Sequence, residues 1–273
     1  MTSQHARSTT AQILPDEPAR LEVAGVKVSY NGHLALNDLS FQVAHGARLA
    51  VVGPNAAGKT TLFKALVGLI PLKSGHIQIH GQPLGHHQDC VAYVPQREEV
   101  DWRFPVTVYD VVMMGRFGQQ GLLQRPSPSD REMVMNSLEQ LGIADLAERA
   151  IGELSGGQQQ RVFLSRALAQ NPHILLMDEP FTGVDFTTQE AALDLLEHLQ
   201  SEQVTAMVST HDLTLASERF DQVLLLNKRM IAYGSPQEVF TPQNLSRAFG
   251  SQVLFLDGVA VVDQCCPPED EFE

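Results

Sequence analysis

The chain has 273 residues, 43% of them hydrophobic, and a formal net charge of −13 at pH 7. This length can bury a full core, as one large domain or as one domain with a sizeable insertion. The acidic balance argues against general nucleic-acid binding and against direct adhesion to anionic lipid. Three cysteines give no disulfide framework, and no apolar run approaches the ~20 residues that a membrane-spanning helix requires.

The chain begins with a polar stretch and then predicted strands. Residues 1–20 contain no apolar core of a secretory signal and are expected to form a flexible leader. Alternating apolar residues from Leu21 to Val28 predict a strand interrupted at Gly25, and a second β-segment follows at Ala35–Val43. Tyr30 ends the first strand, where it could stack on a base or simply pack at a strand edge, and the sequence leaves both interpretations open.

The most informative stretch has the spacing G-x-x-x-x-G-K-T and follows the apolar run 49–52. This context predicts a buried strand, a phosphate-binding loop and a helix, and it argues against a glycine turn that binds nothing. Lys59 is expected to reach the β- and γ-phosphates of a nucleotide, and the Thr60 hydroxyl to ligate Mg²⁺. The predicted nucleotide-binding residues of the loop are Gly53, Asn55, Ala56, Ala57, Gly58, Lys59, Thr60 and Thr61.

The middle of the chain has a mixed character. Further strands are expected near 77–79 and 91–93, and Gln96 follows them. Val100–Phe117 is rich in apolar residues but is broken by Pro105 and Gly115, so it predicts either a partner-docking surface or the core of a small helical subdomain. A helix is predicted at Ser129–Leu141, with Ser129 as its N-cap and Glu132 at the capping-box position.

Two polar motifs follow in the second half. Leu154-Ser155-Gly156-Gly157-Gln158 begins a helix, whose N-terminus is an anion site that lacks a lysine. Asp178-Glu179 ends the buried strand Ile174–Met177, which is where open α/β sheets bind ligands and where a Walker-B carboxylate holds Mg²⁺.

The rest of the chain continues the same alternation. A strand at Val204–Thr210 ends at His211, and a closing hairpin and two short helices follow. Val253–Val262 is predicted to be a last β pair, and the tail 263–273 is acidic. The alternation of strands and helices predicts an α/β core.

Taken together, these motifs resemble those of the ATP-binding cassette (ABC) family, in the order and spacing of that family. Tyr30 matches the adenine-stacking aromatic, Gly53–Thr61 the Walker A motif and Gln96 the Q-loop. Further matches are Leu154–Gln158 (signature), Asp178-Glu179 (Walker B with its catalytic glutamate), Asp185 (D-loop) and His211 (H-loop switch). One departure is Ala56, where the family commonly has glycine; if that position requires a positive φ, alanine costs about 1 kcal/mol.

The resemblance implies a fold and a division into domains. The fold is α/β, a P-loop NTPase core of the ABC type with an antiparallel β subdomain and an inserted helical subdomain. The implied domains are a leader (1–20), an ABC ATPase domain (21–250, helical subdomain about 97–160) and a C-terminal β pair with an acidic tail (251–273).

It also implies a mechanism with ATP and Mg²⁺ as cofactors. The catalytic residues would be Glu179 as general base, His211 and Gln96, and the Mg²⁺ ligands would be Thr60, Gln96 and Asp178. A second ATPase subunit, with a homodimer expected, would close each site. The residues that complete the nucleotide site would be Ser155, Gly156, Gly157, Gln158 and Asp185.

A narrower resemblance concerns the cargo. Val100–Val108 together with Met113–Arg116 looks like the manganese, zinc and iron uptake branch. It implies an ATPase on the cytoplasmic side of the inner membrane, held there by transmembrane permease subunits and served by an extracytoplasmic metal-binding protein. Open alternatives are an importer of iron, a metal chelate or haem, and a soluble ABC ATPase of a non-transport assembly complex. His86-His87 are not expected to be transport ligands.

Overall fold

The computed structural model describes residues 21–30, 32–85, 90–96, 104–119, 125–250, 253–256 and 259–262. The predicted leader, His86-His87, the first part of the candidate docking segment (100–103) and the acidic tail lie outside the described residues. In the described part of the chain, no helix combines the length and the apolar character needed to cross a membrane.

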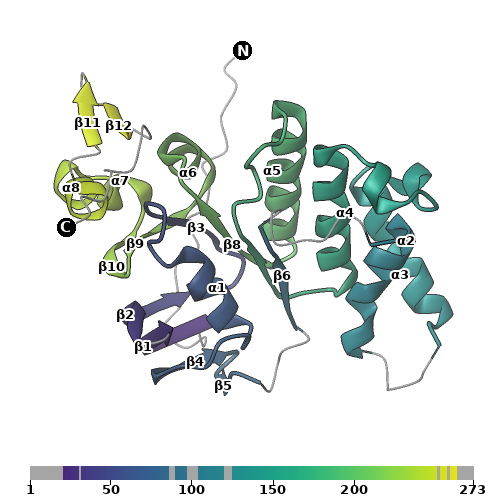
Figure 1. Cartoon of the computed structure of the whole chain (residues 1–273), viewed down its shortest axis with the longest axis horizontal. Helices are drawn as coiled ribbons and strands as arrows, with labels where there is room; N and C mark the ends of the chain where they lie inside the picture. The colour runs from purple at the N-terminus through teal and green to yellow at the C-terminus, as the bar shows by residue number, and fades with distance from the viewer. Residues whose placement is uncertain are drawn as a thin grey trace, which may run out of the picture.

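Two sheets form the centre of the molecule (Figure 1). The antiparallel sheet has the order β2-β1-β4-β5, and the larger sheet has the order β10-β9-β3-β8-β7-β6. The strands of the first are β1 (Leu21–Tyr30), β2 (His33–Val43), β4 (Ser74–Ile79) and β5 (Gln82–Pro83). Those of the second are β3 (Arg48–Val52), β6 (Val91–Val94), β7 (Ile174–Met177), β8 (Thr205–Thr210), β9 (Gln222–Asn227) and β10 (Arg229–Gly234).

The larger sheet is parallel from β9 to β6, and β10 pairs antiparallel with β9. The carboxyl ends of β3, β6, β7 and β8 therefore meet at one edge, the edge at which open α/β sheets bind ligands. A separate antiparallel pair, β11 (Val253–Leu256) and β12 (Val259–Val262), follows the last helix.

Helices cover the larger sheet and form a group at one side of it, where α2, α3 and α4 lie together in Figure 1. All three come between β6 and β7 in the chain. The helices before β7 are α1 (Lys59–Leu66), α2 (Val108–Met113), η3 (Met114–Gln119), α3 (Pro128–Gln140), η4 (Ala144–Leu146), η5 (Ile151–Glu153) and α4 (Gly156–Ala169). Those after it are α5 (Phe186–Ser201), α6 (Leu213–Arg219), α7 (Pro236–Val239) and α8 (Pro242–Phe249).

The larger sheet is buried on both faces, because successive residues of its strands enter two different cores. Leu49 and Val51 pack with α1 and the antiparallel sheet, whereas Ala50 and Val52 pack with the helices of the other face. The continuous apolar runs before Gly53 and Asp178 are explained by this double burial, which fixes the positions of the loops that follow.

In the helical region one expectation was wrong, and one open alternative is decided in part. The N-cap of α3 is Ser127 rather than Ser129, because Pro128 occupies the first helical position and Asp130 completes the capping box. Within the candidate docking segment, the apolar residues of α2 belong to the core, since Val108, Val111, Val112 and Met113 are buried. The exposed large hydrophobic residues of this segment, among those described, are Phe104, Met114 and Phe117.

Candidate nucleotide site

A cavity of about 500 Å³ opens at the carboxyl edge of the larger sheet. It lies where β3 leads into the Walker A loop, β6 into Gln96 and β7 into Glu179. Eleven residues line it: Tyr30, Ala35, Asn55, Ala56, Ala57, Gly58, Lys59, Thr60, Thr61, Gln96 and Glu179. The fold thus brings together residues from four separate parts of the sequence, most of which were expected to hold a nucleotide.

The loop and the start of α1 leave backbone N–H groups for a ligand. The N-cap of α1 is Gly58, at φ 100°, with no side-chain cap and no acidic residue in the first turn. The first amides of a helix lack partners within the helix and carry its positive dipole, so an uncapped N-terminus favours an anion. Triphosphate chemistry fits this cradle.

The loop is held from behind by the β9–β10 turn. The backbone N–H of Lys228 donates to the carbonyl of Ala57 at 2.7 Å, and a Cβ at Gly53 would collide with the carbonyl oxygen of Leu226. Gly53 is therefore required for close packing of the loop against β9.

Ala56 has φ 59°, so the position does require the left-handed region, as the comparison with the family's glycine suggested. The strain costs about 1 kcal/mol. Lys228 adopts a similar angle, φ 56°, in the turn that supports the loop.

Lys59 is buried, with 6% of its surface exposed. Its ammonium donates to the carbonyls of Gly53 at 2.9 Å and Pro54 at 3.3 Å, and it lies 3.3 Å from Oε1 of Glu179. These three oxygen atoms hold the ammonium group at the loop, close to where phosphate oxygens would lie.

The hydroxyl of Ser209, which was not predicted from the sequence, binds both the carboxylate of Asp178 and the backbone of Glu179. Ser209 donates from Oγ to Oδ1 of the fully buried Asp178 at 2.5 Å, and the same Oγ accepts from the backbone N–H of Glu179 at 2.8 Å. Tyr93 donates to the other oxygen of Asp178 at 3.4 Å. A buried serine near the carboxyl end of an apolar strand was the available signal.

Glu179 lies between the lysine and His211. Its Oε2 is 3.9 Å from Nδ1 of His211, and the Glu179 backbone has φ 44°. A positive φ in a non-glycine residue is a local strain that tertiary contacts maintain, and such residues cluster at functional sites. Glu179 also lines a second cavity of about 220 Å³, together with His211, Thr182 and Gln189, so its carboxylate borders both spaces.

The second predicted anion site, at the N-terminus of α4, does not line the nucleotide cavity. Ser155 is the N-cap and forms a capping box: its Oγ accepts from the N–H of Gln158 at 3.4 Å, and Oε1 of Gln158 accepts from the N–H of Ser155 at 2.9 Å. Ser155 is exposed and the two glycines are partly exposed.

The third residue of the helix, which completes the capping box, distinguishes α4 from the other helices that begin with a capping box. In the described part of the chain, the boxes of α2, α3 and α7 carry Asp110, Asp130 and Glu238 at this position, whereas α4 carries the neutral Gln158. A carboxylate there would repel a phosphate, so the amide caps the helix without removing its attraction for anions.

Asp185 caps α5, and its side chain accepts from the backbone N–H and the hydroxyl of Thr188, both at 2.9 Å. These hydrogen bonds, the backbone one first, lower the pKa of Asp185. A Cβ at Gly157 would lie 2.6 Å from Oγ1 of Thr188 and 3.2 Å from Oδ2 of Asp185. The structure therefore places the predicted D-loop residue beside the predicted signature motif of the same chain.

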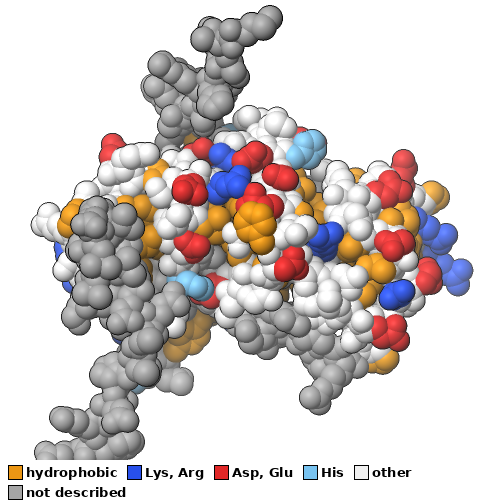
Figure 2. Space-filling view, turned by 90° about the horizontal axis from the view of Figure 1, so that it is seen from above, with side chains coloured by type: hydrophobic (Ala, Val, Ile, Leu, Met, Phe, Trp, Pro, Cys, Tyr) orange, Lys and Arg blue, Asp and Glu red, His pale blue; other side chains and the backbone are white. Residues whose placement is uncertain are grey.

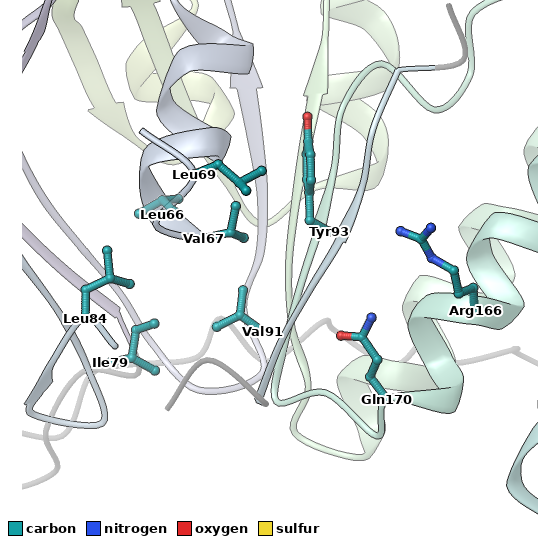
Figure 3. Close-up of a pocket in the computed structure, with 9 residues that line it drawn as sticks. All are labelled: Leu66, Val67, Leu69, Ile79, Leu84, Val91, Tyr93, Arg166 and Gln170. Carbon is teal, nitrogen blue, oxygen red and sulfur yellow. The ribbon is translucent and has the colours of Figure 1, made fainter. Parts of the chain in front are cut away.

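An apolar groove of about 250 Å³ lies between the end of α1 and α4 (Figure 3). Figure 3 shows Leu66, Val67 and Leu69 on one side, Val91 and Tyr93 of β6 between, and Arg166 and Gln170 of α4 across the opening. Burial lowers the pKa of Arg166, and among the described residues this guanidinium forms no ion pair; it lies over the ring of Phe163, 4.9 Å from its centroid.

On the described part of the face in Figure 2, acidic and basic side chains are interspersed and no broad patch of one sign is seen.

Comparison with known proteins agrees with this geometry. The family model for the ABC transporter matches residues 36–182. The chain is 47% identical over 236 residues to the manganese transport system ATP-binding protein MntB of Bacillus subtilis, covering 86% of this chain and 94% of the relative. It is 44% identical over 233 residues to the zinc transport system ATP-binding protein TroB of Treponema pallidum, covering 85% and 88%.

Among solved structures, an inward-facing protein described as a metal-chelate type ABC transporter aligns with a TM-score of 0.76 at 27% identity, over 89% of this chain and 96% of that chain. The Walker A loop, the Walker-B strand and the signature helix all lie within the matched residues 36–182. The chain therefore belongs to the ABC transporter family, as an ATP-hydrolysing subunit.

Proposed function

We propose that this chain energises the import of a divalent metal ion, manganese or zinc, by hydrolysing ATP between two copies of itself. The observation that carries the proposal is the presence of two incomplete half-sites. The Walker A side has a cation but faces no signature helix, and the signature helix has amides and a hydroxyl but no cation. The names of the manganese and zinc relatives support the choice of cargo.

On the Walker A side, the loop amides and Lys59 would bind the phosphates, and Tyr30, which is 45% exposed at the rim of the cavity, would stack on the adenine. The donor set of Thr60, Gln96 and Asp178 suits a hard cation that prefers oxygen ligands. Mg²⁺ held there would neutralise the charge on the β- and γ-phosphate oxygens. Ser209 and Tyr93 would orient Asp178 through their hydrogen bonds.

Glu179 would act as general base by accepting a proton from the attacking water. Its task depends mainly on position, because phosphoryl transfer is mostly positioning and charge neutralisation. His211, 3.9 Å from the same carboxylate, would hydrogen-bond the γ-phosphate and restrict the water. Gln96 would couple the nucleotide site to the segment that follows it.

The partner copy would close the site with the N-terminus of its α4. Ser155 would donate to the γ-phosphate, and the N–H groups of Gly156 and Gly157 would point at the same oxygens. Asp185, beside Gly157, would lie at this interface. Closure stabilised by ATP and lost on hydrolysis would then provide the mechanical switch.

The work would be delivered to permease subunits on the cytoplasmic side of the membrane. We assign their docking site to the apolar groove of Figure 3 and the exposed Met114 and Phe117 of η3. The two are contiguous, because Gly115 packs against the carbonyl of Arg166, which also lines the groove. The occupant would be a short amphipathic helix of the permease with a carboxylate opposite Arg166.

A second cargo, a metal chelate, is favoured by the aligned metal-chelate type transporter structure. Both cargoes require an extracytoplasmic binding protein, and neither would touch this chain. Uptake assays that compare Mn²⁺, Zn²⁺ and chelated iron would separate them.

The decisive experiment is reconstitution with the permease and binding protein. In Glu179→Gln we expect ATP binding to persist while hydrolysis and metal uptake fall by more than about 100-fold, because the water loses its base. Glu148→Gln, which changes an exposed acid that lines none of the three cavities described above, should behave as wild type. Uptake by Glu179→Gln at the normal rate would overturn the proposal.

A further inference from the structure

A group of metal-binding side chains lies away from the nucleotide cavity. His80 follows β4, Cys90 precedes β6 and His173 precedes β7, and one ligand atom from each lies within 4.8 Å of the others. β6 and β7 are parallel, and both begin at this group, so it lies at the amino edge of the sheet, opposite the Walker motifs. Nothing in the proposed ATPase mechanism uses these three residues.

The distances suit one small ion. Nε2 of His80 and Nδ1 of His173 are 3.1 Å apart. Two nitrogen ligands with bonds of about 2.0 Å to a tetrahedral Zn²⁺ are separated by about 3.3 Å. In the structure this contact is a hydrogen bond between the rings, and a metal would replace the shared proton with little movement of either ring.

The backbone fixes all three positions. The N–H of His173 donates to the carbonyl of Cys90 at 2.8 Å, which aligns the two strand starts. His80 (φ 52°) and Gly81 (φ 71°) form the two-residue turn between β4 and β5, and positive angles at both residues are typical of a type I′ turn. Asn is the usual residue at the first of these positions, so the imidazole here is not explained by the turn alone.

We propose that His80, Cys90 and His173 bind one Zn²⁺ ion, with water in the fourth position. Two imidazoles and a thiolate select a borderline-soft ion such as Zn²⁺ or Co²⁺ over Mn²⁺ and Mg²⁺, which prefer oxygen ligands. The Cys90 thiol loses its proton to solvent on binding, so the affinity rises with pH. His173 is exposed and His80 is half-buried, so the ion enters directly from solvent.

The ion would join the two sheets. His80 belongs to the antiparallel sheet, whereas Cys90 and His173 precede neighbouring strands of the larger sheet. The same two strands end at Gln96 and at Asp178-Glu179. Zn²⁺ would thus tie together the strands that carry ATP-site residues at their other ends, and this inference is independent of the proposed importer function.

Cobalt spectroscopy on the full chain, without nucleotide, tests the site. The background carries Cys265→Ser and Cys266→Ser, which remove the other thiols of the chain. We expect Co²⁺ to produce a thiolate-to-cobalt charge-transfer band that saturates at one ion per chain and is abolished by Zn²⁺. We also expect Zn²⁺, and not Mn²⁺, to raise the thermal unfolding midpoint by several degrees.

Variants give the matched comparison. His80→Asn removes the ligand but supplies the residue that a type I′ turn favours, so the fold is retained while the affinity for Co²⁺ falls by more than about 100-fold. Cys90→Ser should lose the charge-transfer band, and His76→Asn, an exposed histidine in the strand that leads to His80, should bind as the background does. A band that persists in Cys90→Ser, equal binding by His80→Asn and the background, or an equal effect of Mn²⁺ would overturn the site.

Discussion

The N-termini of α1 and α4 are both predicted anion sites, and they are built differently. α1 begins at Gly58 with no side-chain cap, and a lysine stands in its first turn. α4 begins at Ser155, whose hydroxyl and Gln158 amide satisfy each other's backbone groups. One end is open and charged, whereas the other is closed by its own polar side chains.

The difference assigns separate tasks to the two ends. An open N-terminus with a cation can hold a phosphate by itself. A capped N-terminus with a neutral third residue is stable alone and retains its dipole, so it can meet a phosphate that another chain already holds.

Gln158→Glu would give the capping box of α4 the acidic residue that the boxes of α2, α3 and α7 have. The box would keep its geometry and the free energy of unfolding should hardly change, but a carboxylate would face the γ-phosphate across the dimer. We expect ATP hydrolysis to fall roughly 100-fold, or about 2.7 kcal/mol of repulsion. Gln237→Glu, an exposed change in α7, is the control, and normal turnover in Gln158→Glu would show that α4 does not meet the phosphate.

Ser155→Ala and Ser127→Ala remove the same kind of cap from α4 and α3. Each should lower the free energy of unfolding by about 1 kcal/mol, measured by urea denaturation. Hydrolysis should fall roughly 10-fold in Ser155→Ala alone, since only that hydroxyl is proposed to donate to phosphate. Equal turnover in the two variants would mean that Ser155 acts only as a helix cap.

Asp130 gives the α3 box a titrating group that the α4 box lacks. Hydrogen bonds from Ser127, then the Arg116 guanidinium 2.9 Å away, lower the pKa of Asp130 to about 2. A carboxylate with a lowered pKa stabilises the fold above its unfolded pKa, near 4, and the stabilisation is lost as pH falls through 2.

Asp130→Asn should therefore be less stable than wild type by about 1 kcal/mol at pH 7, since water screens part of the charge, and the difference should vanish toward pH 2. Denaturation curves across this range measure it. Asp110→Asn in the exposed α2 box, which has no arginine partner among the described residues, is the comparison, and a pH-independent difference for Asp130→Asn would contradict the assignment.

Ala56→Gly concerns the strain in the loop before α1. Because Ala56 has φ 59°, glycine should raise the free energy of unfolding by roughly 0.5 kcal/mol after its larger unfolded-state entropy is subtracted. Ala57→Gly, at a buried neighbour without a positive φ, should instead destabilise. Identical stability changes would mean that the loop relaxes around Ala56.

The features that sequence alone predicted are local ones. The Walker A loop and the Asp178-Glu179 strand end follow from short motifs after apolar runs, and the lack of a lysine near Ser155 predicted an incomplete site. The contacts that sequence could not supply join distant segments. Ser209 reaches Asp178 across neighbouring strands, and the Lys228 turn supports Ala57 from 171 residues later in the chain.

The sequence left the burial of α2 open, beside a docking surface, for the same reason. Its apolar residues contact α4, about fifty residues further along the chain, and a short segment with broken periodicity does not reveal which face will be covered. Cys90 and His173 likewise become neighbours only when β6 and β7 pair.

The contact between Lys59 and Glu179 has a consequence for timing. One ammonium group has three protons, and in the structure two carbonyls and this carboxylate compete for them. A triphosphate that enters the loop would compete for the same protons. Binding of ATP would therefore release the Glu179 carboxylate from Lys59 in the same step. A subunit without ATP would keep this carboxylate paired with the lysine.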